Sequence, residues 1–230
     1  MLSRLFSGLI AAVLSSSAAT VCGAPFILFD YGFNVEGAIT LAPSVAPAGV
    51  DDSAFNYSTG LGVLKITVSG SGPHYLSLFL DHEIDESLNS FFNEYGEPIN
   101  TPLASQSWEI DEPGYTFGNL LQNFQSWRLD NRAAVTSDNV DDVAMAMSWR
   151  LSLEAEQKGE ATFLLSDQPP NSGFYLQHHD PDSKRSIFFS SRLNIVRVHH
   201  VPELVSTMGL MLFGVVSLAW FRGNGSWCQT

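Results

Sequence analysis

The chain has 230 residues, of which 45% are hydrophobic, and a net charge of −13. This length fits one domain with processed ends, and the hydrophobic content is enough for a core, which excludes disorder over the whole chain. Without Arg4, Glu203 and Arg222, residues 25–200 keep nine basic and 23 acidic side chains, a net charge of −14. Such a surface repels phosphate backbones, so the composition argues against a nucleic-acid partner and suits solubility, polysaccharide surroundings or divalent cations.

The first 24 residues have the order of a secretory signal peptide. Arg4 is followed by an apolar run over 5–14 and then by small residues, as in exported chains. Cleavage is predicted after Gly23 or Ala24, and either cut removes Cys22. The alternative is a lipoprotein that keeps Cys22 as its acylated first residue, but the valine before this cysteine is bulkier than that processing usually accepts.

Branched and aromatic residues predict the strands of the body. Residues 61–69 and 74–80 are separated by a short Gly-Ser-Gly-Pro stretch and predict a β-hairpin. Over 143–154, Val, Met, Trp and Leu occupy every second position, which predicts a long half-buried strand. Three further strands are predicted at 161–166, 174–177 and 186–196.

The middle of the chain, 85–132, is less regular and predicts a long insertion with one or two short helices. The stretches SLNSFFNEYGEPIN and TFGNLLQNF could each hold a helical turn. Cys228 lies beyond the C-terminal apolar run, so no disulfide is expected within the body. Together these features predict an all-β fold, an antiparallel β-sandwich-like domain over 25–200 with short helical insertions.

The C-terminal stretch 205–221 is uncharged and 17 residues long, about 26 Å as a helix, which is enough to cross a thin bilayer. Its few polar residues are scattered and form no polar stripe, which argues against a buried core helix. With Arg4 and Arg222 on the inner side, the body lies outside. The expected architecture is therefore a signal helix over 1–24, the β-domain and a C-terminal transmembrane helix.

Pro202, Glu203, the apolar stretch and Arg222 together resemble the PEP-CTERM sorting signal of Gram-negative bacteria. Leu204 stands where that signal usually has its second proline, and Arg222 stands alone in place of a basic cluster. FFNEYGE, QSWEIDEPGYTFG, SGFYLQHHDPDS and IFFSSRLNI resemble the β-rich domain of short PEP-CTERM proteins, so the similarity spans about 60–222.

That resemblance implies a route and a destination for the chain. It implies export across the inner membrane and transient anchoring there by the tail, 201–230, before processing by an exosortase-type protease. It also implies association with the cell envelope or extracellular polysaccharide. No activity is assigned to the family domain, and the sequence contains no Gly-x-Ser-x-Gly elbow, Cys-x-x-Cys pair, Walker loop or His-Glu-x-x-His motif. A non-enzymatic structural or surface role is therefore expected, and a carbohydrate- or calcium-binding module is the alternative.

Asp81, Glu83 and Asp85 alternate just after a predicted strand and form the densest polar cluster. If the strand continues, they share the face of Tyr75 and Phe79. We expect an exposed strand end, and we keep a calcium site and a catalytic carboxylate pair as alternatives.

The segment HHDPDS contains potential metal ligands. His178 and His179 are adjacent on a predicted strand and point to opposite faces, which argues against a shared zinc ion. Asp180 and Asp182 are typical of a simple turn, and their oxygens are an alternative calcium site. A third acidic loop, 138–142, is another possible cation site.

Three tryptophans are relevant to sugar stacking. Trp149 lies in the apolar register of its strand, so we expect it in the core. Trp108 and Trp127 lie in the irregular middle, so we expect them to be exposed.

Overall fold

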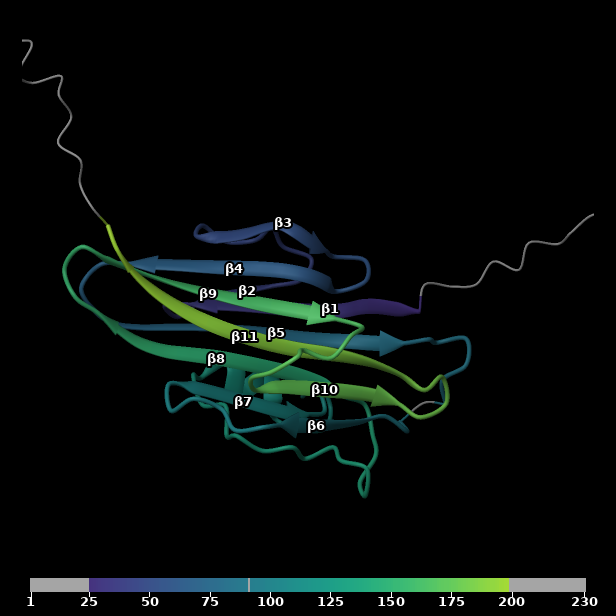
Figure 1. Ribbon diagram of the computed structural model, residues 1–230. Helices are drawn as coiled ribbons and strands as arrows, with labels where there is room; N and C mark the ends of the chain where they lie inside the picture. Colours follow the sequence, from purple (N-terminus) through teal and green to yellow (C-terminus); the bar gives the residue numbers. More distant parts are fainter. Residues whose placement is uncertain (1–24, 91, 199–230) are drawn as a thin grey trace, which may run out of the picture.

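The computed structural model describes residues 25–198 except 91, and these residues form two antiparallel sheets packed face to face (Figure 1). The first sheet consists of β1 (Phe26–Val35), β2 (Ala38–Leu41), β5 (Gly72–Ile84), β7 (Gln106–Asp111) and β8 (Ala144–Leu153). The second consists of β3 (Val50–Asn56), β4 (Leu61–Ser69), β6 (Tyr95–Ile99), β9 (Gln157–Ser166), β10 (Tyr175–Asp180) and β11 (Arg185–Arg197). The strand order is β2-β1-β5-β8-β7 in the first sheet and β3-β4-β9-β11-β10-β6 in the second. The predicted all-β, sandwich-like class is confirmed.

The main core lies between the two sheets. Alternate residues of β4, such as Leu64 and Ile66, and of β5, such as Leu76 and Leu78, are fully buried in one cluster. On β8 the predicted apolar register, which includes Trp149, also points into this core. Period-two alternation on facing strands therefore builds the interior, as in other sandwiches.

The predicted hairpin over 61–80 is wrong, because β4 and β5 belong to different sheets. β4 pairs with β3 and β9, whereas β5 pairs with β1 and β8. Gly70 (φ 106°) and Gly72 (φ 117°) have left-handed backbone angles, which let the chain turn sharply from one sheet to the other. The apolar faces of the two strands therefore meet across the core.

A second, smaller core covers the outer face of the first sheet. The short helix α1 (Leu120–Gln125) packs there, and its Phe124 lies against Phe79 of β5 with ring centroids 5.8 Å apart. Ala144 and Ala146 of β8 are buried in the same cluster. The first half of β8 is thus buried on both faces, and the prediction of a half-buried strand is wrong there.

The irregular middle is an insertion only in part. One of its two predicted helical turns is present as α1, but the described part of 87–100 contains β6 in place of a helix, and β7 follows. β7 pairs with β8 at the edge of the first sheet, and β6 pairs with β10 at the edge of the second. The middle of the chain therefore supplies one edge strand to each sheet.

The described chain begins and ends at opposite ends of the sandwich (Figure 1). β1 starts beside the C-terminal end of β5, whereas β11 ends beside the start of β9. Within 25–90 and 92–198, no helix is long and apolar enough to cross a membrane. The predicted signal helix, its cleavage site, the transmembrane stretch 205–221 and the sorting residues Pro202, Glu203 and Arg222 lie outside the described residues.

Candidate functional site

A groove of about 720 Å³ lies on the outward face of the second sheet. In the strand register, Thr162 of β9 is the partner of Lys65 on β4 and of Arg192 on β11. The three residues form one row across neighbouring strands. Strands lie about 4.8 Å apart, so the backbones of Lys65 and Arg192 are roughly 10 Å apart. Two cations of an acidic protein are thus brought onto one face.

The next row of the groove is apolar and hydroxylic. Val63, Leu164 and Ser190 are aligned across the same three strands, and all three line the groove. Asp51 of β3 is the cross-strand partner of Lys65, and the pKa of its carboxyl is lowered by hydrogen bonds from Ser53 and then by the Lys65 charge. No ion pair within 4 Å joins Lys65 or Arg192 to a carboxylate among the described residues. The groove can therefore offer two cationic groups and hydroxyls to a ligand.

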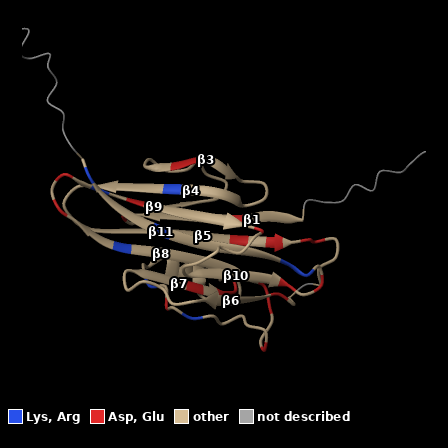
Figure 2. Cartoon of the chain, viewed as in Figure 1, with Lys and Arg blue, Asp and Glu red and all other residues tan. Residues whose placement is uncertain are grey.

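An acidic pocket of about 240 Å³ lies at the C-terminal end of β5, on the face opposite the main core. In Figure 2 this end of β5 is red, and further acidic segments lie in nearby loops. The carboxylates that line it belong to Asp81, Glu83, Glu94 and Asp142. Three aromatic side chains also line it, those of Phe29, Phe92 and Tyr115.

Three of the carboxyl groups that line the pocket, those of Asp81, Glu83 and Asp142, have raised pKa values. Asp81 is only 2% exposed, and burial raises its pKa to about 9, with further increases from Asp142, Glu83 and other carboxylates nearby. Burial and then repulsion from Glu94 raise the pKa of Glu83 to about 7. Burial also raises the pKa of Asp142. All three shifts go in the direction expected for acids withdrawn from water and placed close together.

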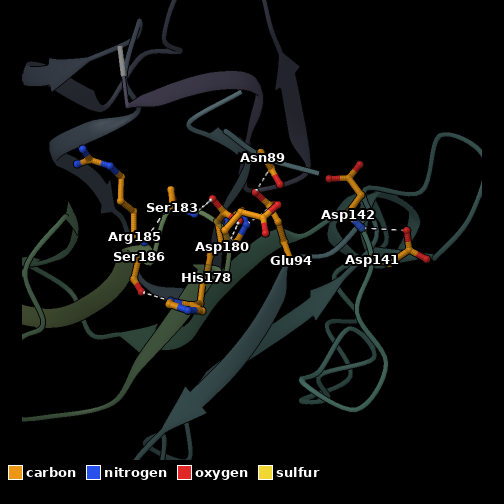
Figure 3. Close-up of polar contacts among 11 residues, drawn as sticks. Asn89, Glu94, Asp141, Asp142, His178, Asp180, Ser183, Arg185 and Ser186 are labelled. Carbon is orange, nitrogen blue, oxygen red and sulfur yellow. Dashed lines mark hydrogen bonds and ion pairs between the residues drawn. The ribbon is translucent and has the colours of Figure 1, made fainter. Parts of the chain in front are cut away.

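Glu94 connects the pocket to the main core. Its Oε1 accepts a hydrogen bond from Nδ2 of Asn89 at 2.9 Å, and its Oε2 lies 2.5 Å from Nε2 of His178. In Figure 3, Asn89 and Glu94 lie between Asp142 on one side and the residues around the β10–β11 turn on the other. Glu94 and His178 are both buried, so the contact with His178 fixes the Glu94 carboxylate where it lines the pocket.

The structure separates the predicted calcium ligands into two groups. Asp81 and Glu83 lie together in the acidic pocket, whereas Asp85 pairs with Arg185, its Oδ2 being 3.3 Å from Nε. Asp180 accepts hydrogen bonds from the backbone N–H groups of Asp182 and Ser183, as expected for the turn interpretation.

Asp182 joins the turn to a neighbouring loop. It accepts hydrogen bonds from the Ser90 backbone N–H at 2.8 Å and from the Asn93 amide at 3.0 Å. In the part of the chain that the structure describes, no group of three or more His, Cys, Asp or Glu side chains is placed to hold a metal ion. Calcium binding stays a prediction.

The expectation of an exposed strand end at 81–85 is wrong for Asp81 and Asp85, which are buried. The outer face of β5 looks solvated in the sequence, but the segment around α1 folds over it. His178 and His179 do lie on opposite faces, because His178 is buried and His179 packs against Tyr95 outside the core.

The tryptophans follow the prediction in two of three cases. Trp149 is in the core and Trp127 is 38% exposed, although its ring stacks on Tyr75 with centroids 4.9 Å apart. Trp108 is 7% exposed and packs against Phe174, so its expected exposure is wrong. β7 places it in the main core.

Sequence reasoning missed the groove, Glu94 and the aromatic rim of the acidic pocket. The alternation of β4, β9 and β11 could have placed Lys65, Thr162 and Arg192 on the outward face, but their alignment in one row needs the strand pairing. Comparisons with protein-family models, curated proteins and solved structures found no match.

Proposed function

We propose that this chain is an exported, non-enzymatic protein of the cell envelope or exopolysaccharide, sorted by its C-terminal tail, whose β-domain binds acidic polysaccharide along the groove of the second sheet. The observation that carries the binding role is the row of Lys65, Thr162 and Arg192. The signal-peptide pattern and the tail motif 202–222 support the route.

An acidic glycan fits this groove for electrostatic and geometric reasons. Carboxylate groups spaced along a sugar chain can meet cations on two strands, and hydroxyls of Thr162 and Ser190 can exchange hydrogen bonds with sugar hydroxyls. Leu164 and Val63 offer an apolar strip to the faces of the sugar rings. The overall negative charge keeps the rest of the surface from binding anions.

Replacement of Arg192 by Gln tests the groove directly. We expect the full chain to bind polygalacturonate but not neutral dextran, with an affinity that falls as salt rises. Arg192→Gln should weaken binding about tenfold, the order expected for loss of one charge-assisted contact. Isothermal titration calorimetry measures both affinities.

Arg128→Gln is the matched control. Arg128 is exposed and lies just after α1, which packs on the first sheet, away from the groove. It removes the same charge and should leave binding unchanged. If both variants lost the same affinity for polygalacturonate, the effect would come from the net charge of the protein and not from the groove. Equal binding to polygalacturonate and dextran would refute recognition of an acidic glycan.

A further inference from the structure

The acidic pocket gathers more carboxyl groups than cationic side chains. Four carboxylates line it, and no Lys or Arg is among its lining residues. Oδ1 of Asp81 is buried and has no hydrogen-bond partner in the described part of the chain. A buried carboxyl without a partner is costly to the fold. The pocket thus presents an unused acceptor to whatever enters it.

Aromatic rings form the rim of the same pocket. Phe29 is 64% exposed and Tyr115 is 52% exposed, and both line the pocket together with Phe92. The Tyr115 hydroxyl donates to Asp30 Oδ2 at 2.5 Å, which fixes its ring at the edge. The face of an aromatic ring attracts ammonium groups, and its apolar area packs against a carbon frame. A bare calcium ion gains no oxygen ligand from such a rim.

We propose that this pocket binds a small organic cation, a primary ammonium group carried on a carbon frame. The carboxylates of Asp81 and Asp142 face the nitrogen, and the rings of Phe29 and Tyr115 contact the frame. An ammonium ion can pair with these carboxyl groups as they ionise, whereas a neutral sugar offers them no charge. The pocket lies at the end of the sandwich and the groove on its outer face, so this inference is independent of the proposed function.

Proton release is a consequence of this binding. Burial, and then the neighbouring charges of Asp142, Glu83, Asp30 and Glu94, raise the pKa of Asp81 to about 9. A bound ammonium ion favours the ionised carboxylate, so binding at neutral pH releases protons. For an amine that stays protonated throughout, the affinity should therefore rise between about pH 6 and pH 9, as Glu83 and then Asp81 ionise.

Calorimetric titration of the full chain with two amines tests the proposal. 5-Amino-1-pentanol carries one ammonium group on an alkyl chain, and glucosamine carries one on a sugar, so the stronger of the two identifies the frame. The matched neutral compounds are 1,5-pentanediol and N-acetylglucosamine. We expect one amine to bind at one site, its neutral partner to bind at least about tenfold more weakly, and the heat to vary with the ionisation enthalpy of the buffer.

Two substitutions locate the site. Asp81→Asn and, at a half-buried position, Asp142→Asn should each weaken amine binding by about tenfold or more. Asp138→Asn is the control, because Asp138 is an exposed carboxylate in the same acidic loop as Asp142. The second variant keeps the test valid if Asp81→Asn does not fold.

Three results would overturn the inference. One is binding of neither amine to the wild-type chain. Another is unchanged amine affinity in Asp142→Asn and in a folded Asp81→Asn variant. The third is binding of calcium chloride at the same site with no response to amines, which would make the pocket a metal site.

Discussion

The Asp81 side chain is an acid kept neutral by its position. Between the pKa of an unfolded aspartate, about 3.9, and the folded value of about 9, the native state binds a proton that the unfolded state releases. The stabilising effect of this proton uptake is complete below the unfolded pKa and is lost as pH rises toward about 9. The protein should therefore become less stable as pH rises across this range, because the unfolded state ionises Asp81 more readily than the folded state does.

Asp81→Asn removes this titration while keeping the side chain close to its size. The free energy of unfolding of the variant, relative to wild type, should increase between about pH 4 and pH 8, by on the order of 5 kcal/mol. Urea unfolding at several pH values measures it. The pKa values of Glu83 and Glu109 are raised to about 7. These two groups should therefore leave a residual dependence of the free energy of unfolding on pH in both proteins. Parallel curves for wild type and variant would show that Asp81 ionises freely in the folded state.

At the scale of single elements, α1 is a short helix held by contacts with the sheet. It has six residues and no side-chain hydrogen bond at its N-cap, so its own propensity is too weak to maintain it. Leu120 and Phe124 are fully buried against β5 and β8, and the Phe124 carbonyl accepts a hydrogen bond from the Asn34 amide at 2.9 Å. This cover buries the outer face on which Phe79 and Asp81 lie.

Phe124→Ala should destabilise the protein by about 3–5 kcal/mol, because it leaves a cavity in the second core. Phe117→Ala is the control on the same segment. Phe117 is 69% exposed, so its loss should change the free energy of unfolding by less than about 0.5 kcal/mol. Thermal or urea unfolding compares the two. A small effect of both would mean that α1 does not dock on the sheet.

The sequence predicts individual strands better than their partners. Alternation places Met145, Met147 and Trp149 in the core, because period two is a local property. Whether 61–80 forms a hairpin or crosses between sheets is not local, because both arrangements bury the same residues. The strands over 26–56 were missed, since β3 (VDDSAFN) lacks an apolar alternation and β1 contains a register shift between Leu28 and Asp30.

The candidate sites were harder to predict for the same reason. Asp81 and Glu83 are close in sequence and were identified together, but Glu94 and Asp142 reach the pocket from separate segments. The row of Lys65, Thr162 and Arg192 needs the pairing of three strands. Only contacts among neighbours in sequence were accessible without the fold.

At the scale of the whole molecule, the main core extends over most of the described chain. Its buried residues run from Phe26 to Phe189, and Leu193 packs against them. The acidic pocket is near the C-terminal end of β5, whereas β11 ends near the start of β5, roughly 30 Å away along that strand. A tail that continues from β11 would thus leave the sandwich at the end opposite the pocket.

Deletion of residues 201–230 should therefore change where the protein is found in the cell without changing its fold. We expect the truncated protein to keep the stability of the full chain to within about 0.5 kcal/mol and to keep its amine and polysaccharide affinities. The full chain should be found in the membrane fraction before processing, and the truncated protein should be exported without membrane attachment. Urea unfolding and cell fractionation measure the two effects. If truncation unfolds the protein, residues 201–230 belong to the core and the sorting interpretation is wrong. If the truncated protein folds but is found in the same cell fractions as the full chain, only the sorting role of the tail is refuted.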